Sequence, residues 1–248
     1  MLTAVLLDLD NTLVLFDETA FYLRYMERII PFFEDLLPGQ AFQERLLRGI
    51  RALRHNDGQT TNLDFFLNVF CDGLSDLRAA VWERFMRFYE TEYDHIPVTF
   101  ERPAGLVAVM DALQRHNLKL VVATNPIFPR LAQEKRLAWA GLDPDHFVLL
   151  THMENMRYAK PHPEYYRQIC AMIGVLPEQC LMVGNDGIND MIAGTVGLKT
   201  FQTTEAGVID YRAVTKGRSL REGENHAADF SGPLSGVPAV VTQLMGSA

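Results

Sequence analysis

The sequence predicts an α/β fold, in which a doubly wound parallel sheet carries an all-helical insert. After Pro103, short apolar runs alternate with helical patterns, which is typical of strand–helix–strand units. Between Asp17 and Pro97 the chain reads as helix after helix. One apolar run, Ala4–Leu7, precedes this helical block. Because a lone strand buries nothing, Ala4–Leu7 must join the later strands, and the helical block is an insert between strands.

The predicted strands are short and apolar, and turn or helix signals follow each of them. In chain order they are Ala4–Leu7, Leu118–Ala123, Phe147–Leu150, Cys180–Val183 and Leu198–Phe201. In the insert, Gln40–Arg54 has apolar residues at amphipathic spacing. The tail, which we assign to the core, is polar and without clear periodicity over Glu205–Asn225. Beyond it, Ala227–Phe230 has the pattern of an edge strand and Val237–Met245 that of a final helix.

These patterns divide the chain into two predicted domains. We assign residues 1–15 and 99–248 to the sheet-containing core and residues 16–98 to an inserted helical cap. A chain of 248 residues is long enough to bury such a core and to carry a smaller insert.

Composition narrows the class of partner. The net charge of -8 argues against nucleic acid or an anionic membrane as the main partner and favours a small molecule. The three cysteines, Cys71, Cys170 and Cys180, match no zinc or disulfide framework and are expected to be reduced core thiols. No apolar stretch approaches the roughly 20 residues of a membrane-spanning helix, so we expect a cytoplasmic location. The oligomeric state is not encoded in any of these patterns.

Two carboxylates directly follow the first strand, in the run Asp8-Leu9-Asp10-Asn11-Thr12. In open α/β sheets such strand ends face the crevice where ligands bind. Because two anions this close repel each other, each needs a cation, hydrogen bonds or a shifted pKa, and a divalent metal is the simplest answer. Taken alone, an Asp-x-Asp sequence is more often a turn that caps the next helix.

Three further strand ends carry polar groups of the matching kind. Thr124-Asn125 precedes a helix N-terminus, where phosphate binds well. Lys160-Pro161 supplies a fixed positive charge, and Gly184-Asn185-Asp186, with Asp190 four residues on, supplies an oxygen ligand suited to magnesium. Each motif alone has a plain structural explanation as a helix cap, a solvated lysine or a turn. Together they favour one shared site, because a right-handed doubly wound sheet brings these strand ends to one edge.

The order and spacing of these four motifs resemble the haloacid dehalogenase-like (HAD) hydrolase superfamily over nearly the whole chain. The resemblance implies a Rossmann-like core with a helical cap inserted between the first and second motifs. It also implies that Asp8 is the nucleophile that forms an aspartyl-phosphate, and that Asp10 is the general acid and then the base. Thr124 and Asn125 would hold phosphate oxygens, and Lys160 would pair with Asp8 and the phosphoryl group.

The resemblance further implies a magnesium ion (Mg²⁺) as cofactor. Its ligands would be the Asp8 carboxylate, the main-chain carbonyl of Asp10 and the Asp186 carboxylate, with Asp190 orienting that shell. This chain departs from many relatives, which place an aspartate directly after the glycine, where Asn185 stands here. We favour Asp186 as the ligand, and Asn185 is the alternative.

The sequence indicates the cap residues that contact a substrate less specifically than it indicates the core motifs. Arg45, Arg48, Arg51 and Arg54 recur every third residue, a pattern that favours a solvated helix face over a site for a second anionic group. Phe16, Asp17 and the polar loop 55–59 are the other candidate contacts.

The sequence therefore predicts a magnesium-dependent phosphohydrolase of the phosphatase type, acting on a small phosphorylated metabolite. A phosphomutase with the same aspartyl-phosphate is the nearest alternative. A 2-haloacid dehalogenase is a weaker one, because it has no use for a second acid that protonates an alcohol. A non-catalytic binding protein is the weakest, because the catalytic set is intact.

Overall fold

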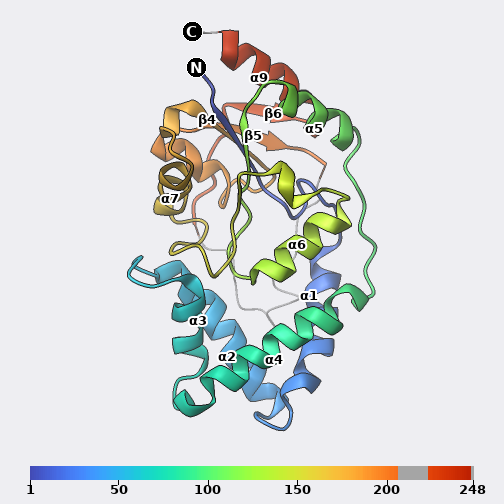
Figure 1. The fold of residues 1–248 in the computed structure, drawn as a ribbon, viewed down its shortest axis with the longest axis vertical. Helices are drawn as coiled ribbons and strands as arrows, with labels where there is room; N and C mark the ends of the chain where they lie inside the picture. The colour runs from blue at the N-terminus through green and yellow to red at the C-terminus, as the bar shows by residue number, and fades with distance from the viewer. Residues whose placement is uncertain (206–222, 247–248) are drawn as a thin grey trace.

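The computed structural model describes residues 1–205 and 223–246, and its centre is a 6-stranded parallel sheet (Figure 1). The strands are β1 (Ala4–Leu7), β2 (Lys119–Val122), β3 (Leu149–Leu150), β4 (Cys180–Gly184), β5 (Lys199–Thr203) and β6 (Phe230–Gly232). Their spatial order is β3-β2-β1-β4-β5-β6, and every neighbouring pair is parallel. The predicted α/β class is confirmed, and β1 is a central strand between β2 and β4.

Both faces of the sheet are buried, and this explains the apolar runs in the sequence. In β1, Val5 and Leu7 belong to one apolar cluster, whereas Ala4 and Leu6 belong to a second cluster. Successive side chains of a strand point to opposite faces, so the two clusters lie on the two sides of the sheet. A strand covered on both sides is apolar at every position instead of at alternate ones.

Helices cover both faces. The cluster that contains Val5 also holds residues of α5 (Leu106–Arg115), α6 (Arg130–Trp139) and α9 (Val237–Gly246). The cluster that contains Leu6 holds residues of α7 (Pro163–Ile173). In Figure 1, α5 and α9 lie together on the side of the sheet away from α7. Helix α7 begins at a proline and ends before Gly174, whose left-handed conformation (φ 66°) suits glycine.

Between β1 and α5, the chain forms helices and turns, together with two isolated β-bridges that pair Asp10 with Val14 and Leu15 with Glu101. The helices are α1 (Glu18–Ile29), α2 (Gly39–Ala52), α3 (Asn62–Phe70) and α4 (Arg78–Thr91), with short 3₁₀ helices at Ile30–Phe33, Leu53–His55, Ser75–Leu77 and Tyr93–His95. They lie beyond one end of the sheet, in the lower half of Figure 1. We call this group the cap; its boundaries at residues 16–98 stay a prediction.

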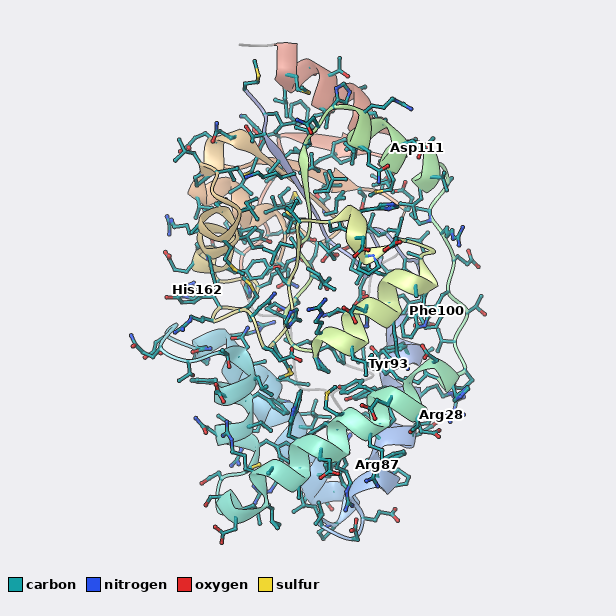
Figure 2. The ribbon with its side chains drawn as sticks, viewed as in Figure 1. Arg28, Arg87, Tyr93, Phe100, Asp111 and His162 are labelled. Carbon is teal, nitrogen blue, oxygen red and sulfur yellow. The ribbon has the colours of Figure 1, made fainter. Side chains whose placement is uncertain are left out.

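Aromatic side chains join the cap to the core. Phe21 of α1 and Tyr93, which follows α4, both contact Trp139 of α6, with ring centroids 6.0 and 5.2 Å apart. Figure 2 shows Tyr93 between α4 and α6. Phe128, just before α6, packs against the same two elements of the cap. This cluster holds the cap helices close to the loop that follows β2.

The remaining elements are short, and two strands differ clearly from their predictions. Strand β6 is Phe230–Gly232, whereas an edge strand was predicted at Ala227–Phe230. Further 3₁₀ helices span Pro144–His146, Pro177–Gln179, Met191–Val196 and Leu234–Gly236. Strand β3 is only Leu149–Leu150, whereas Phe147–Leu150 was predicted, because the Phe147 N–H donates to Pro144 inside the preceding turn. Most of the polar segment Glu205–Asn225 lies outside the described residues. The three cysteines are buried and free, as predicted, and no described helix is long and apolar enough to span a membrane.

Candidate active site

The strand order reverses next to β1, and this reversal positions the site. The chain passes from β1 to β2 and β3 on one side of the sheet and then returns to β4 on the other side. Such a point leaves a crevice at the carboxyl ends of the strands. Asp8 directly follows β1, and its N–H donates to the carbonyl of Val183 in β4 (2.8 Å). The strand ends that precede Asp8 and Asp186 are therefore adjacent.

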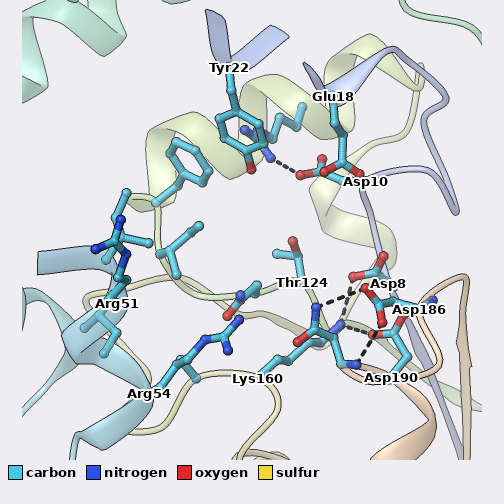
Figure 3. A pocket seen from close by; sticks show the side chains of 18 of the residues that line it. Asp8, Asp10, Glu18, Tyr22, Arg51, Arg54, Thr124, Lys160, Asp186 and Asp190 are labelled. Carbon is cyan, nitrogen blue, oxygen red and sulfur yellow. Dashed lines mark hydrogen bonds and ion pairs between the residues drawn. The ribbon is translucent and has the colours of Figure 1, made fainter. Parts of the chain in front are cut away.

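A cavity of about 140 Å³ opens at this edge, and all the residues that the four motifs predicted for the site line it. These are Asp8, Asp10, Thr124, Asn125, Lys160, Asp186 and Asp190, and the alternative ligand Asn185 lines it too. The cap closes the other side with Tyr22, Met26, Leu47, Ile50, Arg51, Leu53 and Arg54. Figure 3 shows Asp8, Asp186, Asp190 and Lys160 together on the core side of this cavity. The four strand ends thus form one site, as the sheet topology required.

Lys160 connects two of these carboxylates. Its ammonium donates to Asp8 Oδ1 (2.8 Å) and to Asp190 Oδ1 (2.5 Å), and its side chain is only 1% exposed. The other oxygens of the pair are held as well, since Thr12 donates to Asp8 Oδ2 and the Asp186 N–H donates to Asp190 Oδ2. Both carboxylates therefore have fixed orientations around one buried cation.

Burial and charge act on these groups in opposite directions. Burial by itself lowers the pKa of Lys160, but the Asp190 and Asp8 carboxylates raise that pKa well above its ordinary value. Burial raises the pKa of Asp190 to about 7, although the Lys160 cation lowers it. Lys160 is therefore a permanent positive charge beside Asp8.

Asp186 supplies a second fixed carboxylate. Its Oδ1 accepts hydrogen bonds from the N–H groups of Ile188 (2.8 Å) and Asn189 (3.1 Å), and its Oδ2 accepts one from the Asn189 side chain (3.2 Å). This is an Asx-type turn, which an aspartate after a Gly-Asn pair forms readily. The turn sets the direction of the carboxylate next to the end of β4.

These residues fit a magnesium ion. Within the described residues, no three histidine, cysteine or acidic side chains cluster as a metal site. A magnesium site does not require three such protein side chains, because this ion is commonly bound by one or two carboxylates together with waters and substrate oxygens. Asp8 and Asp186 line the same cavity edge, and the lining residues that the structure describes include neither histidine nor cysteine. The donor set is one of hard oxygens.

Thr124 and Asn125 stand where the chain leaves β2. The Thr124 carbonyl accepts hydrogen bonds from Thr151 (2.7 Å) and Tyr165 (2.8 Å), which fix this turn. The Asn125 side-chain oxygen is buried and has no hydrogen-bond partner in the described structure. Both side chains face the cavity that Asp8 lines.

Sequence reasoning missed Arg136, which pairs with Asp10. The Arg136 side chain is 1% exposed; one nitrogen donates to Asp10 Oδ2 and Nε donates to Tyr93 (2.7 Å). Its guanidinium also lies over the ring of Phe128, 4.1 Å from the centroid. One signal was available: Arg136 is four residues from both Ala132 and Ala140, so it stands on the apolar face of α6.

Sequence reasoning also missed Glu18, which lines the cavity near Asp10. Asn11 donates to Glu18 Oε1 (2.8 Å), and its own left-handed conformation (φ 58°) turns the chain after the first motif. Burial raises the pKa of Glu18 to about 8, and the nearby Asp10 carboxylate adds to this shift. Burial likewise raises the pKa of Asp10, against the opposing charge of Arg136.

The four cap arginines divide into two pairs. Arg45 donates to the carbonyls of Phe70 and Asp72, and Arg48 donates to that of Val69, so these two cap the end of α3. Arg51 and Arg54 line the cavity instead. The interpretation as a solvated helix face is therefore wrong for the second pair, because Arg51, at the end of α2, and Arg54, in the turn that follows, both reach the cavity.

The other candidate cap contacts do not line the cavity. Phe16 is buried in the aromatic cluster, and Asp17 caps α1 by accepting from the Ala20 N–H. The loop 55–59 does face the core, since Arg157 donates to the carbonyls of Gly58 (3.0 Å) and Gln59 (2.9 Å). These residues hold the cap in place.

Comparison with known proteins agrees with this arrangement. A family model described as haloacid dehalogenase-like hydrolase matches residues 2–196, which include all four motifs. Among curated proteins, the pyrophosphatase PpaX of Bacillus pumilus (strain SAFR-032) is 26% identical over 204 residues, which is 80% of this chain and 82% of that protein.

Solved structures share the fold. A 2-haloacid dehalogenase from Pseudomonas syringae pv. tomato DC3000 superposes with a TM-score of 0.62 at 17% identity, covering 98% of this chain and 99% of that one. A predicted phosphoglycolate phosphatase from Haemophilus somnus 129PT does so with a TM-score of 0.55 at 16% identity, covering 97% and 98%. At such identities the likeness concerns the fold alone.

The Asp10–Arg136 pair should dominate the stability of this region. We expect Arg136→Met to lower the free energy of unfolding by roughly 3–5 kcal/mol, because it leaves Asp10 buried without its counter-charge. The double variant Asp10→Asn/Arg136→Met should recover part of that loss. Urea unfolding of the two single variants and the double variant measures this coupling.

A matched control is Arg24→Met, which breaks an exposed ion pair with Glu27 and should cost at most about 1 kcal/mol. Strictly additive effects of the Asp10 and Arg136 substitutions would show that the two side chains do not interact.

Glu18 should make stability depend on pH. Because the pKa of Glu18 is raised from 4.5 to about 8, the folded protein keeps a proton that the unfolded chain releases above pH 4.5. Its contribution to stability is therefore fully present below about pH 4.5 and is lost as the pH rises towards 8. Glu18→Gln has no proton to lose, so between pH 5 and pH 8 it should gain roughly 1–3 kcal/mol relative to wild type.

The measurement is urea unfolding of both proteins at pH 5 and pH 8. Titration of Asp190 is common to the two proteins and cancels in the difference. An equal stability difference at both pH values would contradict the raised pKa of Glu18.

Proposed function

Since the chain belongs to the haloacid dehalogenase-like hydrolase family, we propose that it hydrolyses a small phosphorylated metabolite, with magnesium, through an aspartyl-phosphate on Asp8. One observation carries the proposal: Lys160 holds Asp8 at a buried strand end, in the same cavity as Asp10, Thr124 and Asp186. A carboxylate fixed beside a permanent cation and a phosphate-binding turn is arranged to attack phosphorus.

In the first step, a carboxylate oxygen of Asp8 bonds to phosphorus while the bond from phosphorus to the leaving oxygen breaks. The charge on the transferring group is offset by Lys160, and Thr124 and Asn125 hold its oxygens. The leaving oxygen takes a proton from Asp10. Burial favours this role, because it raises the pKa of Asp10 and so favours the protonated carboxyl.

In the second step, Asp10, now a carboxylate, removes a proton from a water molecule. The water oxygen bonds to phosphorus as the bond to Asp8 breaks, which releases phosphate and restores both aspartates. Asp10 Oδ1 is suited to carry the proton, because Oδ2 is bound to Arg136 while Oδ1 is buried and has no partner in the described structure. Arg136 thus leaves one oxygen of Asp10 available for proton transfer.

The metal would be held by the Asp8 carboxylate, the main-chain carbonyl of Asp10 and the Asp186 carboxylate. Asp190 would orient these ligands through its hydrogen bonds with Lys160 and the Asp186 N–H. When bound, magnesium supplies positive charge that lowers the repulsion between Asp8 and the incoming phosphate. Asn185 is the alternative ligand.

Two other reactions share this fold. A dehalogenase needs the first aspartate but no acid that protonates an alcohol, so the Asp10 carboxyl in the cavity favours phosphate transfer. A mutase would use the same aspartyl-phosphate and pass it to another hydroxyl. The curated relative named a pyrophosphatase adds pyrophosphate to the substrates worth testing.

Asp8→Asn should abolish turnover. We expect magnesium-dependent phosphate release to fall by at least about 10³-fold, because the nucleophile is lost. The assay measures phosphate released from phosphoglycolate, phosphoserine, sugar phosphates, nucleotides, pyrophosphate and a chromogenic ester, with and without magnesium.

The control is Asp111→Asn, which removes an exposed carboxylate on α5, away from the cavity (Figure 2). Halide release from 2-chloropropionate without magnesium would instead support a dehalogenase. Conversion of one phosphate ester into its isomer without free phosphate would support a mutase.

Asp10→Asn should trap the intermediate. An activated ester such as 4-nitrophenyl phosphate needs no acid to leave, so the first step survives, whereas hydrolysis should slow by about 10²–10⁴-fold without the base. We expect a burst of one nitrophenol per protein molecule and a mass increase of one phosphoryl group on the peptide that contains Asp8. Phosphorylation of any other residue would rule out Asp8 as the nucleophile.

A further inference from the structure

The cap side of the cavity carries positive charge that the proposed reaction does not use. Arg51 and Arg54 line the cavity on that side, opposite Asp8 and Asp186 in Figure 3. Lys160, the cation beside the phosphoryl group, is already paired with two carboxylates. Arg136 is paired with Asp10. The guanidinium of Arg51 therefore needs a separate explanation.

Arg51 has an unused binding edge. Its Nε and Nη2 atoms are both buried, and neither has a hydrogen-bond partner in the part of the chain that the structure describes. These two nitrogens lie on the same edge of the guanidinium plane, the edge that binds carboxylate or phosphate with two parallel hydrogen bonds. Leaving both donors unpaired is costly, so this edge is suited to a ligand that accepts both bonds.

We propose that Arg51, with Arg54 beside it, binds a second anionic group of the substrate, so that the substrate is a small phosphate ester that also carries a carboxylate or a second phosphate. The inference rests on the proposed function, since it takes the phosphoryl group to lie at Asp8. It goes beyond that function by naming the class of substrate and the residue that selects it.

The distribution of charge supports this orientation of the substrate. Asp10 and Asp190 lie with Asp8 and Asp186 on the core side, and Glu18 of α1 lies near Asp10, so a second anion would be repelled there. Apolar side chains also line the cavity: Leu47 and Ile50 from the cap, and Ile127 and Phe128 from the loop after β2. In such surroundings a guanidinium attracts an anion more strongly than it does in water.

The size of the cavity limits the distance between the two anionic groups. At about 140 Å³ it is smaller than the pockets that hold drug-sized ligands, so only a few atoms fit between the phosphoryl group and the second anion. Arg51 also borders an open groove with Arg45, Arg48 and His55. This basic groove on the cap would attract an anionic substrate towards the cavity.

The test compares matched pairs of esters. Phosphoglycolate is paired with 2-hydroxyethyl phosphate, in which an alcohol replaces the carboxylate. 1,3-Propanediol bisphosphate is paired with 3-hydroxypropyl phosphate, in which a hydroxyl replaces the second phosphate. In wild type, the member with the second anionic group should have the higher kcat/KM in at least one pair. Which pair shows this preference tells a carboxylate site from a phosphate site.

Arg51→Gln should remove this preference selectively. We expect kcat/KM for the preferred ester with a second anionic group to fall roughly 10- to 100-fold, mostly through KM, while that of its hydroxyl partner changes less than about threefold. Arg51→Lys keeps the charge but lacks the two-donor edge, so its loss should be intermediate.

The matched control is Arg48→Gln, three residues earlier on the same helix and 50% exposed. It removes the same charge without touching the cavity and should change both members of a pair equally. The thermal midpoint of Arg51→Gln should stay close to that of wild type, because no described hydrogen bond of Nε or Nη2 is lost.

A binding measurement separates this inference from turnover. In the Asp8→Asn background, calorimetry should show that the preferred ester with a second anionic group binds roughly 10- to 100-fold more weakly once Arg51→Gln is added. Equal losses for the esters with and without a second anionic group, or an Arg48→Gln effect as large and as selective as that of Arg51→Gln, would overturn the inference. Hydrolysis of none of these esters by wild type would count against the proposed function instead.

Discussion

The ammonium of Lys160, buried between the carboxylates of Asp8 and Asp190, is the interaction on which the rest of the site depends. It joins the end of β1, the loop after β3 and the turn after β4, three segments far apart in the sequence. Without this cation, two carboxylates would be buried close together, which neither burial nor their mutual repulsion permits. Glycine is needed at position 184 for the same arrangement, because a Cβ there would lie 2.3 Å from Asp190 Oδ2 and would displace this carboxylate.

The cap depends on a second buried cation. Arg136 extends from α6 of the core to Tyr93 and Asp10 and lies over an aromatic ring, so it ties the cap, the acid of the first motif and the helix after β2 together. An arginine suits this place because it stays charged when buried and its planar group can bond and stack at once. The same side chain therefore orients Asp10 and contributes to the attachment of the cap.

These two cations are neutralised by the protein, whereas the binding edge of Arg51 is not. The site thus combines a core side rich in carboxylates with a cap side that offers unpaired donors. Such an arrangement would orient a substrate with two anionic ends, the phosphoryl group at Asp8 with the metal and the other anion at the cap. The cap would then select the substrate, and the core would carry out the reaction.

The sequence by itself determined the sheet, the insert and the residues at the strand ends. Apolar runs, turn residues and motif spacing are local properties, and a parallel sheet gathers its strand ends at one edge whatever the details of its helices. The tertiary structure alone decided the roles of Arg136, Glu18 and Arg51. An arginine or a glutamate on a helix looks solvated in sequence, and only packing between α1, α2, α6 and the strand ends shows that these three side chains are turned inward. The raised pKa values of Glu18 and Asp190 have the same origin, since burial and neighbouring charges come from segments that are distant along the chain.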